Sequence, residues 1–201
     1  MTRFVLASAS PARLETLRRA GVEPEVIVSG VAEDTVVAPS PAGLVERLAE
    51  LKAIAVAERV DGAALVLGCD SLLDLNGRPL GKPGDADTAA QRWREMRGRI
   101  GRLHTGHCLI DTGTGRRSGC SVETAVRFAD LTDAEIDAYC ATGEPSAVAG
   151  GFTIDGLGGW FVDGVAGDHH NVVGVSLPAL RGLLHELGYA LPDIGYPATR
   201  S

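Results

Sequence analysis

The segment at residues 64–80, ALVLGCDSLLDLNGRPL, most strongly limits which folds this chain can adopt. Its first five residues form an uninterrupted apolar run, which is typical of a strand buried on both faces of a sheet. Asn76-Gly77 is a strong signal for a two-residue hairpin between antiparallel strands. A buried strand followed by a hairpin excludes an all-parallel sheet, so the segment predicts a mixed one.

The rest of the chain alternates between strand and helix patterns. Serine or threonine caps precede the helices, and Thr132-x-x-Glu135 is a capping box. These patterns predict an α/β fold in which helices flank the mixed sheet. Further strands are expected at residues 4–7, 24–30, 103–111 and 121–129, with one or two short strands in 150–174, and helices at 11–21, 41–58, 87–97, 132–143 and 178–187.

The length of 201 residues suits a single domain, residues 1–201, with two lobes around a cleft as one possibility. Residues from about 192 to 201 are expected to form a loosely held tail. In the long helix at 41–58, Leu44, Leu48, Leu51 and Ala55 fall on one apolar stripe, and Lys52 is expected to flank it.

Composition excludes several classes of protein. A net charge of −7 argues against non-specific binding to nucleic acid, which requires a basic face. No apolar run is long enough to span a membrane, and the run at residues 4–7 is too short for a signal peptide. The four cysteines show neither metal-site nor disulfide-framework spacing. We therefore expect a reduced, cytoplasmic protein.

The turn after the first strand carries Ser8, Ser10, Pro11 and Arg13. Unpaired amides and a partial positive charge at a helix N-terminus favour phosphate, and an arginine can add a bidentate contact. The plainer interpretation is a capping serine beside a surface arginine.

Asp70 follows the buried apolar run. A carboxylate there is costly unless it emerges at a cleft, where catalytic carboxylates commonly lie. The alternative is an aspartate that begins a turn. Lys82 precedes a proline, which restricts its backbone and directs the cation, although most lysines are simply solvated. Glu33 and Lys52 carry little signal by themselves.

The four histidines His104, His107, His169 and His170 would form a metal site only if the fold brought them together. We expect structural or surface roles for them.

Three blocks together resemble the Maf family of nucleoside triphosphate pyrophosphatases, septum formation inhibitor Maf-like proteins that share a fold with the inosine triphosphatases. They are LASASPARLETLRRAG near the N-terminus, GCDSLLDLNGRPLGKP in the middle, and GEPSAVAGGFTIDGLGGWFVDGVAGDHHNVVGVSLPAL in the last third. The resemblance covers nearly the whole chain.

This resemblance implies an elongated mixed sheet, two lobes around a cleft and a homodimer. It also implies hydrolysis of a nucleoside triphosphate between its α and β phosphates, with Mg²⁺ or Mn²⁺, as a house-cleaning reaction. Asp70 matches the proton acceptor, and Glu33 and Asp70 the metal ligands. The substrate-binding positions of the family match Ser8, Arg13, Glu33, Lys52 and Lys82.

Three positions depart from the family branch that prefers dTTP and UTP. Its double arginine is Ala12-Arg13 here, its Asp-Thr is Asp70-Ser71, and its Gln is Asp155. Because Ala12, Ser71 and Asp155 match positions that help select the base, the resemblance leaves base preference open. A nucleotide-binding regulator of septum formation without turnover is an alternative, and a phosphatase that releases orthophosphate is another.

Overall fold

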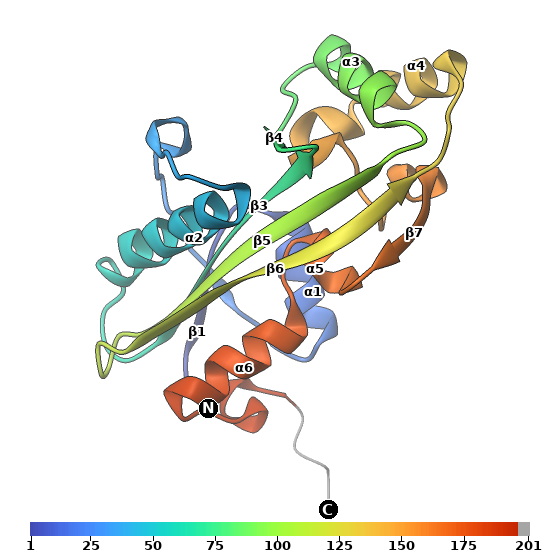
Figure 1. Ribbon diagram of the computed structural model, residues 1–201. Helices are drawn as coiled ribbons and strands as arrows, with labels where there is room; N and C mark the ends of the chain where they lie inside the picture. The colour runs from blue at the N-terminus through green and yellow to red at the C-terminus, as the bar shows by residue number, and fades with distance from the viewer. Residues whose placement is uncertain (197–201) are drawn as a thin grey trace, which may run out of the picture. The chain divides into compact units, whose positions relative to one another are not determined.

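The computed structural model describes residues 1–196 (Figure 1). Within them, seven strands form one sheet in the order β2-β1-β3-β5-β6-β7, with β4 paired to β3. The strands are β1 (Phe4–Ala7), β2 (Glu25–Val26), β3 (Leu65–Leu75), β4 (Arg78–Leu80), β5 (Ile100–Asp111), β6 (Arg117–Phe128) and β7 (Val162–Ala166).

The helices of residues 1–196 are α1 (Pro11–Arg19), α2 (Pro41–Ala57), α3 (Ala86–Met96), α4 (Asp133–Ala141), α5 (His169–Val173) and α6 (Leu177–Leu187). Short 3₁₀ helices include η1 (Glu33–Thr35), η4 (Leu157–Phe161) and η5 (Leu191–Ile194). β1 runs parallel to β2 and β3, whereas β3–β4 and β6–β7 are antiparallel. The predicted α/β class and mixed sheet are confirmed.

The chain divides into two compact units, and the divisions fall within β3, β5 and β6 and directly after α5. Of the described residues, the first unit comprises 1–70, 105–122 and 174–196, and the second comprises 71–104 and 123–173. The predicted cleft between two lobes stays a prediction.

In the first unit, alternate residues of β3 belong to two separate cores. Leu65, Leu67 and Cys69 pack with leucines of α1 and α6, while Val66 on the opposite face packs with Val56 of α2. This two-sided burial confirms the interpretation of the apolar run, because side chains alternate across a strand. Gly68 and Asp70 share the Val66 face by the same alternation.

In the second unit, the core is centred on the fully buried Trp93 of α3. Its ring makes edge-on contacts with Phe128 and Tyr139, with centroids 5.5 Å apart in each pair. The indole Nε1 donates to the carbonyl oxygen of Gly151 at 2.8 Å. α3 and α4 are thereby joined to the sheet of this unit.

Two local signals are confirmed in detail. Asn76 and Gly77 have φ angles of 56° and 85°, the positive values that a type I′ turn requires, and they connect β3 to β4. The Thr132 side chain accepts from the Glu135 N–H, while the Glu135 carboxylate accepts from the Thr132 N–H. Both signals act through hydrogen bonds and backbone angles within four consecutive residues.

Two strand bounds differ from expectation. β2 extends over two residues rather than the whole of 24–30, because its partner β1 has only four residues and the last bond runs from the Ile27 N–H to the Leu6 carbonyl oxygen. β3 continues to Leu75 through its pairing with β4. Asp70 therefore lies inside a long strand instead of following the end of a short one.

The buried face of α2 also differs. Val45, Leu48, Ala49, Lys52, Ala53 and Val56 are buried, whereas Leu44, Leu51 and Ala55 are only partly buried. The small residues face the sheet because two sheet glycines admit the helix backbone, as described below. Lys52 consequently lies within the buried face and does not flank it.

The expected loose tail is partly wrong. The Asp193 carbonyl oxygen accepts from the Thr2 N–H at 2.7 Å, and the Ile194 side chain is buried. These contacts hold η5 against the rest of the first unit, and residues 197–201 of the predicted tail lie outside the described residues. Among residues 1–196, no helix is both long enough and apolar enough to cross a membrane.

Candidate functional site

Gly68 determines where α2 lies on the sheet. A Cβ atom at Gly68 would lie 2.2 Å from the Ala49 carbonyl oxygen and 2.8 Å from the Ala53 nitrogen, both of α2. Gly106 of β5 admits the same helix, since a Cβ there would lie 2.1 Å from the Val45 carbonyl oxygen. Figure 1 shows α2 alongside β3 and β5. Only glycine permits this approach, and the approach brings Lys52 to the Asp70 side of β3.

Lys52 joins two carboxylates. Its Nζ lies 2.6 Å from Asp70 Oδ1 and 2.7 Å from Glu33 Oε1. The side chains of Lys52 and Asp70 are 9% and 11% exposed, while that of Glu33 is 50% exposed. Glu33, the exposed member of the three, belongs to η1. The structure brings these three predicted residues together.

The Asp70 carboxyl has a pKa raised above its ordinary value of 3.8. Burial is the main cause, because desolvation disfavours the charged form. The positive charges of Lys52 and Arg13 oppose this rise, and Glu33 adds to it. A carboxylate with a raised pKa is a better proton acceptor than a fully solvated one.

The start of α1 holds Ser8 and Arg13 in contact. Arg13 Nη1 donates to Ser8 Oγ at 3.1 Å, and the same oxygen accepts from the Ser10 N–H at 3.2 Å. Ser10, rather than Ser8, is the N-cap, since its Oγ accepts from the Arg13 N–H. Both Ser8 and Arg13 are buried. The surface-arginine alternative is therefore excluded, and a buried guanidinium adjoins a helix N-terminus.

The remaining predicted residues are placed as follows. Ala12 is half-buried in the first turn of α1, and Ser71 follows Asp70 on β3. Lys82 and Asp155 are exposed residues of the second unit. The structure assigns them no shared site with Asp70, so their roles stay predictions. Lys52 and Lys82 are the only lysines of the 201-residue sequence.

Glu144 organises the loop that carries Asp155. Its carboxylate accepts from the Tyr139 hydroxyl at 2.8 Å, from the backbone N–H groups of Leu157 and Gly158 at 3.0 and 2.9 Å, and from the Thr153 hydroxyl. These hydrogen bonds lower the pKa of Glu144 even though burial opposes them. The loop backbone is thereby fixed around one ionised carboxylate.

The donor set fits a divalent cation shared with a substrate. Glu33 and Asp70 already converge on one cation, the Lys52 ammonium. Within residues 1–196, no group of three or more His, Cys, Asp or Glu residues could hold a metal without other ligands. Mg²⁺ commonly binds through one or two carboxylates together with substrate phosphates and water. Glu33 and Asp70 are suited to that arrangement rather than to a closed protein site.

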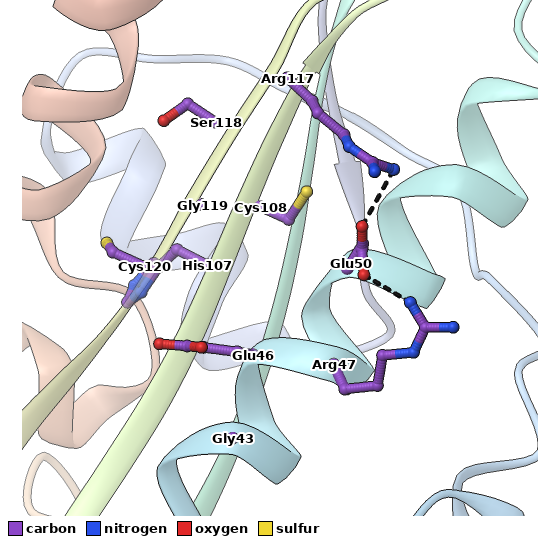
Figure 2. Close-up of a pocket in the computed structure, with 10 residues that line it drawn as sticks. All are labelled: Gly43, Glu46, Arg47, Glu50, His107, Cys108, Arg117, Ser118, Gly119 and Cys120. Atoms are coloured by element: carbon purple, nitrogen blue, oxygen red, sulfur yellow. Dashed lines mark hydrogen bonds and ion pairs between the residues drawn. The ribbon is translucent and has the colours of Figure 1, made fainter. Parts of the chain in front are cut away.

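A separate cavity of about 410 Å³ in the first unit contains none of the residues predicted to bind substrate or metal or to act as the base, although His107 lines it. Figure 2 shows Glu50 in ion pairs with Arg47 and Arg117, which line it. Burial raises the pKa of the neighbouring Cys108 thiol to about 11, so this thiol is unreactive near neutral pH.

Sequence reasoning missed the three glycines that shape the site, Gly68, Gly106 and Gly174. Gly174 accepts a 2.8 Å hydrogen bond from Arg13 Nε through its carbonyl oxygen. Because 161 residues separate the two, no local pattern indicates the contact. The histidine expectation agrees with the structure at His107, whose Nε2 accepts from the buried Ser176 N–H.

A family model described as Maf-like protein matches residues 3–187. A Streptomyces coelicolor protein named nucleoside triphosphate pyrophosphatase is 56% identical over 197 residues, covering 98% of this chain and 96% of that protein. A Streptomyces avermitilis protein of the same name is 55% identical, with 97% and 95% covered. A solved structure of the Staphylococcus aureus Ham1 protein has 16% identity and a TM-score of 0.44, with 64% and 73% covered. The family match spans the segments that carry Ser8, Arg13, Glu33, Lys52 and Asp70, and on that match the chain belongs to the Maf family.

Proposed function

We propose that this chain hydrolyses nucleoside triphosphates between the α and β phosphates, giving a nucleoside monophosphate and pyrophosphate. The observation that carries the proposal is the buried Asp70 carboxylate, held by Lys52 and influenced by the Arg13 charge. The relatives named nucleoside triphosphate pyrophosphatase support the same reaction class.

The phosphates need positive charge and hydrogen-bond donors. Arg13, Ser8 and the α1 N-terminus supply them in the first unit, and we assign Lys82 as a further phosphate ligand. Such groups stabilise the charge that develops on phosphate oxygens as the anhydride bond breaks. They also reduce the repulsion between a polyphosphate and an attacking water oxygen.

Asp70 acts as the base. Its Oδ1 is held by Lys52 Nζ, and we assign the other carboxylate oxygen, Oδ2, as the one that takes the proton from the attacking water. A general base contributes about 10²–10⁴-fold, so phosphate binding must supply the rest of the acceleration. Mg²⁺ or Mn²⁺ bound by Glu33 and Asp70 would neutralise phosphate charge and orient the phosphates.

We propose that Ala12, Ser71 and Asp155 contact the nucleobase of the substrate. Asp155 offers only acceptors, whereas a glutamine would offer both a donor and acceptors. If Asp155 contacts the nucleobase, the hydrogen bonds it offers differ from those of a glutamine, and base preference stays open. A homodimer and a cytoplasmic location are also proposed, and light scattering tests the first.

The test is product analysis with purified protein, Mg²⁺ or Mn²⁺, and a panel of nucleoside triphosphates. Pyrophosphate with monophosphate supports the proposal, orthophosphate indicates a phosphatase, and binding without product indicates a regulator. Asp70→Asn should lose at least about 10²-fold in kcat while keeping its fold, because an amide cannot accept the proton. Asp61→Asn, at an exposed aspartate of the same unit, is the matched control.

A further inference from the structure

Two hydrogen bonds orient the Arg13 side chain, one to Ser8 in the same turn and one to Gly174, which is distant in sequence. Nε donates to the Gly174 carbonyl oxygen at 2.8 Å, and Nη1 donates to Ser8 Oγ at 3.1 Å. Because a guanidinium is planar, two bonds at two different nitrogens fix both its position and the orientation of its plane. All three residues belong to the first unit.

Gly174 is suited to this contact in two ways. Its φ of +125° lies where side-chain-bearing residues are strained. A Cβ atom at this position would also lie 3.1 Å from Arg13 Nε and 3.3 Å from Arg13 Cγ. The absence of a side chain at Gly174 thus leaves room for the aliphatic part of Arg13, next to the carbonyl oxygen that accepts the hydrogen bond from Nε.

The carbonyl of Gly174 is itself held by buried neighbours. Val175 is fully buried, and the Ser176 N–H donates to His107 Nε2 of β5 at 2.9 Å. Ser176 also caps α6, since its Oγ accepts from the Ala179 N–H at 3.1 Å. Two residues after Gly174, the chain is therefore tied to a central strand and to a helix, which limits movement of the carbonyl oxygen.

From this geometry we infer that Gly174 is a positioning residue for Arg13, and that its carbonyl and its lack of a side chain hold the guanidinium in the orientation that binds phosphate. The inference rests on the proposed function only in taking phosphate as the ligand of Arg13. Gly174 does not touch the substrate. Its effect passes through Arg13, where a displacement of about 1 Å can cost on the order of 10²-fold in rate.

The first experiment compares Gly174→Ala with Gly188→Ala. Gly188 ends α6 in the same unit with a φ of +89°, and a Cβ there would meet nothing within 4 Å. The control therefore carries the backbone strain without the contact to Arg13. We expect Gly174→Ala to raise the Kd for inorganic tripolyphosphate and the KM for nucleoside triphosphate by about 10- to 100-fold. Gly188→Ala should stay within about twofold, and equal effects of the two variants would overturn the inference.

A double-mutant cycle separates positioning from a general structural role. Arg13→Lys removes the Nε donor, so Gly174→Ala should change tripolyphosphate affinity by less than about threefold in that background. The same loss in both backgrounds would show that Gly174 acts independently of Arg13, against the inference.

A measurement on the unaltered protein covers the case in which Gly174→Ala does not fold. The Arg13 Nε–H signal, identified by its loss in Arg13→Lys, should exchange slowly with solvent in nitrogen NMR spectra. Rapid exchange would contradict the hydrogen bond to Gly174.

Tripolyphosphate binding also separates the two proposals. If the protein binds tripolyphosphate in a Gly174-dependent manner but cleaves no nucleotide, the proposed function fails and this inference stands. If it cleaves nucleotides and Gly174→Ala is unchanged in binding and KM, only this inference fails.

Discussion

Lys52 Nζ lies 2.6 Å from Asp70 Oδ1, although 18 residues separate the two in sequence. The same ammonium lies 2.7 Å from Glu33 Oε1. One cation thus holds the carboxylate that we assign as the base, and it favours the ionised form of that carboxylate against the effect of burial. The behaviour of the site with pH follows from this balance.

The acid limb of the pH profile should lie above the ordinary aspartate pKa of 3.8, because burial raises the pKa of Asp70. The base works only when ionised, so kcat/KM falls as the pH drops through this raised pKa. Lys52→Met removes a charge that lowers the pKa, and the limb should move to still higher pH. Profiles of kcat/KM from about pH 4 to about pH 9 measure the shift.

Arg47→Met is the control for this shift, because it removes an exposed cation from the same helix. Its acid limb should coincide with that of the unaltered protein. The proposed role of Lys52 in lowering the pKa of Asp70 would be contradicted if the acid limb of Lys52→Met stayed in place or moved to lower pH.

Glu33→Gln should weaken the dependence on metal rather than the fold. Loss of one carboxylate charge is expected to raise the Mg²⁺ concentration for half-maximal activity about tenfold, equivalent to about 1.4 kcal/mol. Stability should change little, because the Glu33 side chain is 50% exposed and such ion pairs contribute weakly. Asp34→Asn, the next residue of η1, is the matched control. Equal metal titrations for both variants would argue against Glu33 as a ligand.

Gly68→Ala should destabilise the first unit. The added Cβ would lie 2.2 Å from the Ala49 carbonyl oxygen, and overpacking of this kind costs about 1–3 kcal/mol in the free energy of unfolding. It should also lower kcat/KM, since α2 carries Lys52. Gly182→Ala in α6, where a Cβ meets nothing within 4 Å, should be neutral or stabilising by up to about 1 kcal/mol. Urea unfolding measures both, and equal stabilities would count against the close contact.

The two lysines allow a chemical test that needs no variant. Limited reductive methylation should modify the exposed Lys82 well before Lys52, whose side chain is only 9% exposed. If Lys82 is a phosphate ligand, tripolyphosphate with Mg²⁺ should slow its methylation, while the N-terminal amine provides the internal reference. Mass spectrometry of the digested protein measures both rates. If tripolyphosphate leaves the methylation rate of Lys82 unchanged, Lys82 is not a phosphate ligand.

Local signals in the sequence predicted those parts of the fold that local chemistry determines. The positive φ angles at Asn76 and Gly77 and the capping box at Thr132 depend on residues no more than three positions away. The motif blocks around Ser8, Asp70 and Lys82 indicated the family. They did not indicate where these residues lie relative to one another in space.

The tertiary structure alone decided which residues meet. The leucines of α2 suggested one buried face, yet the glycines at positions 68 and 106 draw a small-residue face onto the sheet and bury Lys52. Packing of backbone on backbone overrides side-chain hydrophobicity there, because a missing Cβ lets the helix approach more closely. The hydrogen bond from Arg13 to Gly174 likewise spans 161 residues, a separation that no periodicity in a sequence encodes.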